Sequence, residues 1–324
     1  MQNDTINKSR QRIEFVRRYG TVIGALMIFI IFSFASENFF TARNFMMLLR
    51  QLSMLTIVAM GFTFVMAAGG FDMSIGNLTG LINMVFTIVL LNTNSFLLAT
   101  IAGITIGLIV GFVNGTLVAY IGLPDFIATF AVGSIVYGIK MLLTKGNPIF
   151  FREDAPAIAK AIGQGYLGPI PLPVIFMLIY VLLGIFVLSK TSFGRRIYAI
   201  GGNATASIFA GIDIKKYRRY TFLISGFSVA LAAIILTSRL GSGQPLAGED
   251  FLLDAIAVAF LSSTMFGEGE PNGAGTFVGA FIVGMLNNGL TMLNVPYYFQ
   301  YITKGLVVIL AVVLSAVFAK KLSE

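Results

Sequence analysis

The hydrophobic pattern of this chain consists of long, almost continuously apolar stretches separated by short polar segments. A helix that crosses the hydrocarbon core of a membrane needs about 20 mainly apolar residues. About ten stretches have this character, at roughly 19–36, 47–68, 73–91, 96–119, 126–144, 172–189, 220–238, 251–266, 273–291 and 298–318. The pattern predicts an all-α polytopic membrane protein with about ten transmembrane helices.

The longest polar interruption, residues 190–219, is strongly cationic, with Asp213 as its one acid. Asn203 is a good N-cap for a short helix from about Ala204 to Ala210, because its side-chain oxygen accepts a free backbone N–H. Gly211 is suited to end that helix in the left-handed conformation. We therefore predict a short helix between two basic flanks, through which the protein passes a force or signal to something in the cytoplasm.

Lys and Arg in flanking segments orient the chain, because cytoplasmic loops carry an excess of both. The amino-terminal arm 1–18, the loop 190–219 and the tail 319–324 are all basic, so we expect all three in the cytoplasm. Residues 19–318 then form a single membrane domain, with 145–171 as a periplasmic loop. The first apolar run lacks a convincing cleavage site and is expected to stay as a first span.

Two outer segments follow from this orientation. Residues 145–171 are rich in proline and mixed charge, and are expected to hold a short interfacial helix near 154–163. Residues 239–250 are expected to form a second outer loop. Lys140, Arg239 and Lys304 lie in or near span ends, where their long side chains can reach water.

A repeated glycine pattern relates two parts of the chain. Glycines spaced by four or five residues occur on the spans 96–119 and 273–291, and Ala68–Asp72 resembles 247–251. The offset is five spans, so spans 2–5 and 7–10 would enter the membrane in opposite directions, as in many transporters. Glycine rows also allow close helix packing, which is the simpler interpretation.

The segment from Gly69 to Gly76 has two open interpretations. Two glycines interrupt the helix, an acid follows, and Asp72 or Ser74 is placed to cap the next helix. One interpretation is a plain cytoplasmic turn. The other is a helix broken at membrane depth, whose freed backbone groups line a cavity.

Polar side chains within the apolar stretches are costly against lipid and are expected to face the protein interior. They either bond neighbouring helices to one another or line a translocation path. The candidates for the path are Phe71, Asp72, Ser74, Asn77, Asn83, Asn114, Asn287 and Asn288.

Composition narrows the function. The chain is 57% hydrophobic and 11% charged, whereas a soluble domain has about 25% charged residues. The net charge of +8 therefore suits membrane orientation and not a nucleic-acid partner. Without Cys and His, thiolate, Cys/His metal and His acid–base sites are excluded. No Gly-x4-Gly-Lys-Ser/Thr phosphate loop occurs. We expect no enzyme, no metal and no other cofactor.

Three segments resemble the permease subunits of bacterial ABC importers for ribose and related sugars, the inner-membrane components of binding-protein-dependent transport systems. GGFDMSIGNLTGL at 69–81 looks like their Gly-Gly-[Ile/Val]-Asp-Leu-Ser-x-Gly segment. GRRIYAIGGNATASIFAGIDIKKYR at 194–218 resembles their cytoplasmic segment, and NVPYYFQYITKGLVVILAV at 294–312 their last span. The resemblance covers nearly the whole chain.

In that family the cytoplasmic segment holds the coupling helix, which docks on the ATPase subunit. Together with the neighbouring Arg196, the corresponding residues here are Gly194, Arg195, Ala199, Gly201, Gly202, Asn203, Ala206, Gly211 and Ile212. The resemblance implies a bacterial plasma (inner) membrane location, lipid contacts and three kinds of protein partner. These are ATPase subunits, a periplasmic or lipid-anchored solute-binding protein, and a second permease subunit in a homo- or heterodimer.

One segment departs from the family pattern. Residues 262–273 have fewer glycines than the family shows and contain two acids. This fits a divergent member or one half of a heterodimeric pore. The expected function is the permease subunit of an ATP-driven importer of a sugar or sugar-like solute; the alternative is a secondary transporter driven by an ion gradient.

Overall fold

The structure, a computed structural model, describes residues 23–266 and 269–323, so the predicted arm 1–18 lies outside the described residues. Within this part of the chain, seven helices are long and apolar enough to cross a membrane. They are α2 (Ala42–Ala67), α3 (Ile75–Thr93), α4 (Phe96–Thr116) with its π-helical continuation η1 (Leu117–Ile121), α5 (Asp125–Thr144), α7 (Leu172–Lys190), α10 (Ile214–Leu240) and α12 (Gly273–Met292). The prediction of an all-α polytopic membrane protein is confirmed.

Shorter elements complete the fold. The shorter apolar helices are Ile23–Ala35, α11 (Phe251–Ser263) and the part Tyr297–Val313 of α13 (Tyr297–Ser323). Outside the apolar helices lie α6 (Ala157–Gln164), α8 (Ser192–Gly202) and α9 (Ala204–Phe209). The strand β1 (Ile149–Phe150) pairs antiparallel with β4 (Ser242–Gly243), and β2 (Tyr166–Leu167) pairs with β3 (Ile170–Pro171).

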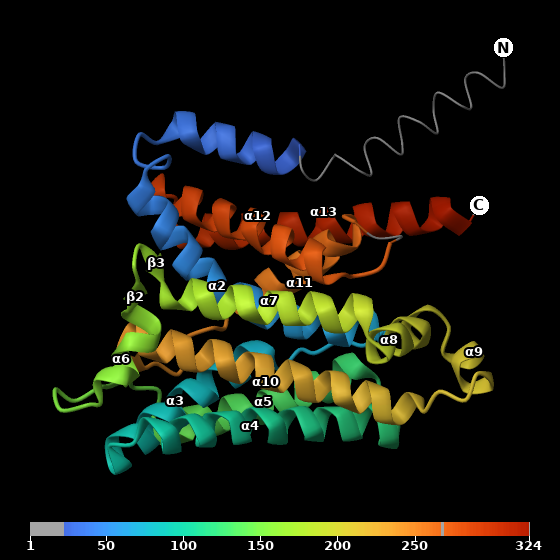
Figure 1. The fold of residues 1–324 in the computed structure, drawn as a ribbon, viewed down its shortest axis with the longest axis horizontal. Helices are drawn as coiled ribbons and strands as arrows, with labels where there is room; N and C mark the ends of the chain where they lie inside the picture. The colour runs from blue at the N-terminus through green and yellow to red at the C-terminus, as the bar shows by residue number, and fades with distance from the viewer. Residues whose placement is uncertain (1–22, 267–268, 324) are drawn as a thin grey trace.

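The long helices run side by side along the molecule (Figure 1). The small elements α6, β2 and β3 lie at one end, which we call the α6 end. The helices α8 and α9 lie at the other end, the α9 end, as does the carboxyl end of α13. The helix expected near 154–163 is observed as α6, and the helix expected at 204–210 is observed as α9. The preceding helix α8 was not predicted.

Glycines bring α4 and α10 into direct backbone contact. A Cβ added at Gly107 of α4 would clash with the carbonyl oxygen of Gly226 of α10, and the reverse also holds. Gly111 meets the carbonyl oxygen of Phe222 in the same way. Small residues permit this close approach of backbones in lipid. The packing interpretation of the glycine rows is therefore confirmed on α4.

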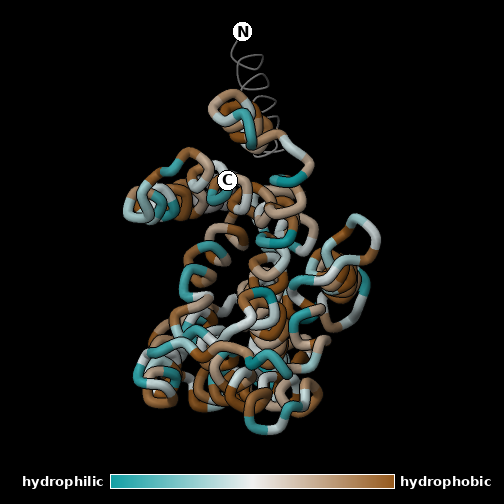
Figure 2. The backbone as a smooth tube through the Cα atoms, turned by 90° about the vertical axis from the view of Figure 1, so that its left-hand side faces the viewer, coloured by the Kyte–Doolittle hydropathy of each residue, from teal (hydrophilic) through white to brown (hydrophobic). Residues whose placement is uncertain are grey.

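Apolar side chains cover the outer faces of the peripheral helices. Most of α2 and α10 is buried, whereas α4 and α7 leave wide faces exposed. Large exposed side chains on these faces include Leu98, Ile109 and Phe112 on α4 and Leu182 and Phe186 on α7. Viewed from the α6 end, the helices are mainly coloured as hydrophobic (Figure 2). Contiguous exposed apolar surface of this size is typical of contact with a membrane.

The two halves of the chain pack in matching ways. In the first half, α4 packs against α3 and α10, while α5 packs against α3. In the second half, α12 packs against α11 and α2, while α13 packs against α11. The helices α2 and α10 also pack against each other, so the halves interlock through their central helices.

Candidate functional site

The break between α2 and α3 lies inside the bundle. Gly69 has a φ of +72°, and the chain then runs along the first turns of α5. The N–H of Phe71 donates to Asp125 Oδ2 at 3.2 Å, and the N–H of Met73 donates to Thr129 Oγ1 at 2.9 Å. Ser74 packs against Gly133, eight residues after the first residue of α5, which corresponds to about 12 Å along that helix. The segment therefore runs into the bundle and is not a plain turn at the surface, whereas the cavity of the second interpretation stays a prediction.

Asp72 is the polar centre of this break and is 1% exposed. Its Oδ1 accepts from the N–H of Ser74 at 3.0 Å and from Ser74 Oγ at 2.6 Å, while Oδ2 accepts from Ser225 Oγ at 2.9 Å. Asn114 Nδ2 donates to Ser74 Oγ at 2.9 Å. The expectation that Asp72 or Ser74 caps α3 is wrong, because no side-chain cap bond forms there and both groups bond within this cluster, which reaches α4 and α10.

A second segment, 241–250, enters the bundle from the α6 end. The N–H of Gln244 donates to Asn83 Oδ1 of α3 at 2.8 Å. Gly243 packs against Thr87, and Glu249 packs its backbone against Gly76 near the start of α3. The expectation of an outer loop at 239–250 is therefore wrong. Arg239 belongs to α10, and the segment after it folds inward because Gly243 and its neighbours fit closely on α3.

The inner end of segment 241–250 carries two carboxylates, which pair with side chains of α5 and α13. Lys140 Nζ of α5 lies 2.7 Å from Glu249 Oε1 and donates to Asn77 Oδ1 of α3 at 3.1 Å. The Lys140 side chain is fully buried. The expectation that Lys140 reaches water is wrong, because Glu249 and Asn77 provide partners inside the protein.

The next two acids bond to α13. The hydroxyl of Tyr301 donates to Asp250 Oδ1 at 2.5 Å, and Lys304 Nζ lies 3.3 Å from Asp254. Asn287 Nδ2 of α12 also donates to Asp254 Oδ2, at 3.0 Å. Lys304 therefore forms an ion pair inside the protein, and the expectation that its side chain reaches water is wrong. We call Asn77, Lys140, Glu249, Asp250, Asp254, Tyr301 and Lys304 the central polar cluster.

Sequence reasoning missed most of this cluster. Of its members, only Asn77 was a predicted path residue. A signal did exist, since 247–251 resembles Ala68–Asp72. That likeness predicts that Glu249 and Asp250 belong to a segment that runs into the bundle, as Asp72 does.

The predicted path residues fall into separate groups. Asp72, Ser74 and Asn114 share one cluster, Asn83 holds segment 241–250, and Asn288 exchanges two hydrogen bonds with Asn44 of α2. Among the eight, Phe71, Asn77 and Asn287 keep part of their surface exposed.

The α9 end gathers the predicted coupling residues. Asn203 Oδ1 accepts from the N–H of Ala206 at 2.9 Å, as expected of an N-cap, and Gly211 has a φ of +74°. Gly201 packs against the carbonyl of Ala67, which ties α8 to the end of α2. Most predicted coupling residues are exposed: Arg195, Arg196, Ala199, Gly201, Gly202, Asn203, Ala206 and Gly211. Gly194 is buried, and Ile212 is half-buried.

Apolar side chains also project at this end. Phe209 of α9 is 87% exposed, and Phe266 is 71% exposed. The hydroxyl of Tyr198 donates to the carbonyl of Pro271 at 2.7 Å, which fixes the divergent segment beside α8. Burial, together with the charge of Glu270, raises the pKa of Tyr198 to about 12. Residues 267–268 of that segment lie outside the described part of the chain.

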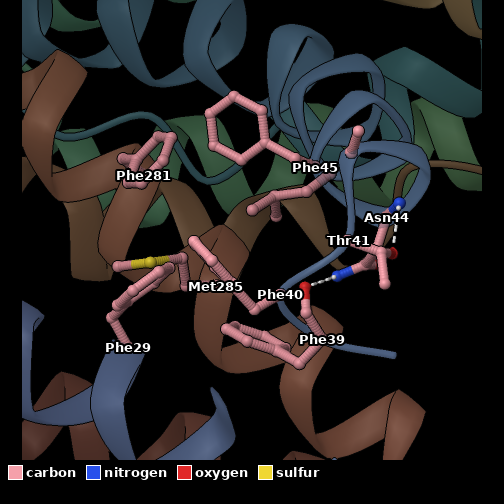
Figure 3. Close-up of a pocket in the computed structure, with 10 residues that line it drawn as sticks. Phe29, Phe39, Phe40, Thr41, Asn44, Phe45, Phe281 and Met285 are labelled. Atoms are coloured by element: carbon pink, nitrogen blue, oxygen red, sulfur yellow. Dashed lines mark hydrogen bonds between the residues drawn. The ribbon is translucent and has the colours of Figure 1, made fainter. Parts of the chain in front are cut away.

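Two cavities in the described residues are apolar. One, of about 380 Å³, lies between helix 23–35, α2 and α12, and its lining includes Phe29, Phe45 and Met285 (Figure 3). The amide of Asn44 in the lining of this cavity already has hydrogen-bond partners, because its Nδ2 donates to the carbonyl of Phe39 and to Asn288 Oδ1. The other, of about 390 Å³, lies between α4, α7 and α10. Such linings suit lipid chains better than a polyhydroxylated solute.

Comparison with known proteins identifies the family. The sequence profile of a family described as "Branched-chain amino acid transport system / permease component" matches residues 44–312. The "Ribose import permease protein RbsC" of Haemophilus influenzae is 37% identical over 315 residues, which cover 96% of each chain. The "D-allose transport system permease protein AlsC" of Escherichia coli is 35% identical over 94% of each chain.

A third relative is more distant. The "Xylose transport system permease protein XylH" of Haemophilus influenzae is 33% identical over 91% of this chain and 94% of its own. No solved structure matches the chain. The matches agree with the resemblance inferred from the three sequence segments. The chain belongs to the branched-chain amino acid transport system / permease component family, whose members are membrane-embedded subunits of transport systems and not enzymes.

Proposed function

We propose that the chain is the permease subunit of an ATP-driven importer, and that it forms the translocation path for a neutral sugar. The observation that carries this proposal is the full-length similarity to permeases named for ribose, allose and xylose. These relatives favour the ATP-driven interpretation over an ion-driven secondary transporter. ATP hydrolysis then occurs on a separate partner subunit, because this chain has no phosphate-binding loop.

The α9 end is the proposed contact with that ATPase. The short capped helix α9 exposes the apolar side chains of Ile208 and Phe209, and the preceding helix α8 exposes the basic residues Arg195 and Arg196. Exposed aromatic side chains are typical anchors of protein interfaces. Gly201 against Ala67 and Tyr198 against Pro271 connect α8 to α2 and to the segment before α12. A push on α9 would therefore reach several spans at once.

The proposed orientation follows the basic segments. The arm 1–18, the loop 190–219 and the tail 319–324 lie in the cytoplasm, and the loop 145–171 lies in the periplasm. In support, the carboxyl end of α13 lies at the α9 end, opposite α6 (Figure 1). Residues 19–318 then form one membrane domain of about ten spans in the bacterial inner membrane.

We also propose that spans 2–5 and 7–10 form an inverted repeat. The matched packing of α2–α5 and α10–α13 supports this, because the contacts of α4 with α3 and α10 and of α5 with α3 have counterparts in those of α12 with α11 and α2 and of α13 with α11. In both halves the segment between the first and the second helix runs into the bundle, at 68–74 and 241–250. Broken helices near the symmetry axis are a recurrent feature of transporters.

In the assembled importer, two permease subunits, alike or different, enclose the path, two ATPase subunits bind the α9 ends, and a periplasmic or lipid-anchored binding protein delivers the solute. We propose that the half-exposed Phe71, Asn77 and Asn287 face this path. The buried Asp72, Ser74, Asn83, Asn114 and Asn288 support it by joining the helices around it.

The test is uptake by the reconstituted complex. Proteoliposomes that contain this chain, its ATPase and its loaded binding protein should accumulate D-ribose, D-allose or D-xylose when ATP is supplied. Uptake should survive an ionophore and stop when ATP is depleted. Uptake that survives ATP depletion and collapses with the ionophore would overturn the proposal in favour of an ion-driven transporter.

A further inference from the structure

Carboxylates are exposed on one side of the molecule at a depth where the other helix faces are apolar. The outer faces of α4 and α7 expose large side chains such as Ile109 and Leu182. Glu249 and Asp250, by contrast, are consecutive exposed residues at the inner end of segment 241–250. Glu249 bonds to Lys140 of α5 and Asp250 to Tyr301 of α13, so this pair lies between the last helices of the two halves.

The depth of this pair follows from its contacts with α3. Segment 241–250 meets Thr87 at Gly243 and meets Gly76 at Glu249. Gly76 lies two residues after Ser74, which packs against Gly133, about 12 Å along α5 from its first residue. Helix α5 has 20 residues and is about 30 Å long, as long as the hydrocarbon core is thick, so the pair lies near the middle of that helix. A carboxylate that faces lipid at that depth costs several kcal/mol, so such groups face a water-filled cavity or the protein interior. The surface around Glu249 and Asp250 therefore does not face lipid, and in this chain both carboxylates are open to water.

This surface carries hydrogen-bond acceptors that have no donor among the described residues. Lys140 occupies Glu249 Oε1 and Tyr301 occupies Asp250 Oδ1. The second oxygen of each carboxylate has no hydrogen bond to any described residue. Below them, Asn287 Oδ1 is buried and also lacks a partner in the described part of the chain. A buried polar atom normally has a partner, often water, so a hydroxylated ligand or water is expected beside this cluster.

Aromatic rings occur among the neighbours of this pair: Tyr301 bonds to Asp250, and Tyr137 lies beside Lys140, the partner of Glu249. Tyr301 is 48% exposed and Tyr137 is 44% exposed. Lys140 Nζ lies 4.9 Å from the centre of the Tyr137 ring. Rings offer an apolar face to the C–H side of a sugar, and ionised carboxylates accept bonds from its hydroxyl groups. Three carboxylates face two ammonium groups here, so the site is unfavourable for anions.

We infer that Glu249, Asp250 and Tyr301 form a solute-contact site in the translocation path, where the free carboxylate oxygens accept hydroxyl groups of a neutral sugar. The inference rests on the proposed function and adds the part of the path that contacts the solute. Lys140 is a positioning residue, because it holds Glu249 and does not reach the surface.

The first test uses the absence of cysteine from the natural sequence. A single cysteine is introduced as Asp250→Cys, and, for a matched lipid-facing control, as Leu182→Cys, where the natural side chain is 66% exposed on α7. Each variant is assembled with its partners in proteoliposomes and treated with a cationic, membrane-impermeant methanethiosulfonate, without nucleotide and after vanadate trapping with ATP. The Asp250→Cys thiol should react at least ten-fold faster than the control in one of these states. Equal, slow reaction at both positions in both states would overturn the inference.

The second test measures transport with the charge removed. Asp250→Asn keeps the shape of the side chain and an oxygen for Tyr301, and it should lower D-ribose, D-allose or D-xylose uptake about ten-fold. ATP hydrolysis stimulated by the loaded binding protein should stay within two-fold of the natural chain. Glu153→Gln, which removes an exposed carboxylate of the loop 145–171, is the control and should leave uptake unchanged.

The outcomes separate the two proposals. If proteoliposomes with the wild-type chain take up none of the three sugars when ATP is supplied, the proposed function is overturned, whatever the labelling shows. Normal uptake with Asp250→Asn, in a wild-type system that transports, would overturn only the solute-contact site.

Discussion

The two residues of the Lys140–Glu249 ion pair differ in how much of each side chain is exposed. The Lys140 side chain is fully buried, while the Glu249 side chain is 39% exposed. Removal of one partner of a buried pair is costly because the other charge is left unpaired and out of water. The two members of this pair therefore contribute differently to stability.

We predict that Glu249→Gln is more destabilising than Lys140→Met. The first replaces the carboxylate by a neutral amide, so the buried ammonium keeps only neutral oxygens such as Asn77 Oδ1 as partners; loss of the opposite charge costs about 3–5 kcal/mol in a fully buried pair. The second leaves a carboxylate that water reaches, as in a surface pair worth about 1 kcal/mol or less. Thermal unfolding in detergent micelles would measure the order, and the double substitution should recover most of the loss. A larger loss for Lys140→Met than for Glu249→Gln would contradict this assignment.

At the scale of elements, the α4–α10 contact depends on glycine. Gly107→Ala places a methyl group against the carbonyl of Gly226 and should separate the helices. Gly138→Ala on α5 is the control, because a Cβ there meets nothing within 4 Å. Alanine is about 0.5–1 kcal/mol better than glycine inside a helix, so the control should unfold at the same or a slightly higher temperature. Gly107→Ala should unfold at a clearly lower temperature, and an unchanged midpoint would show that the crossing is not tightly packed.

The elements also differ in how well they can be predicted from the sequence. Helix α9 was predictable because its signals are local: Asn203 caps it and Gly211 follows it. The Lys140–Glu249 pair could not be predicted from local signals. Its members are 109 residues apart, and they come into contact only because segment 241–250 folds into the bundle. That segment looks like a polar loop in sequence, and its inward path depends on the close fit of Gly243 and Glu249 to α3.

The molecule as a whole combines the α9 end, which we propose as the contact with the ATPase, with the central polar cluster. Charge reversal at Arg195 and Arg196 should uncouple uptake from ATP hydrolysis without lowering the amount of protein in the membrane. The same reversal at Lys215 and Lys216, which flank α9 on its other side, is a control with equal charge change. We expect uptake to fall at least ten-fold in the first variant and by less than two-fold in the second. Equal effects would indicate that net charge, and not this contact, matters.

The central claim is that α9 is the cytoplasmic contact through which an ATP-hydrolysing partner drives the permease. The most direct measurement is the labelling of a single cysteine, introduced as Thr205→Cys on the exposed surface of α9, in vesicles of both orientations. An impermeant thiol reagent should modify this position in inside-out vesicles alone, and the bound ATPase subunit should block the reaction. Modification from the outside of intact cells would put α9 on the wrong face of the membrane and contradict the account.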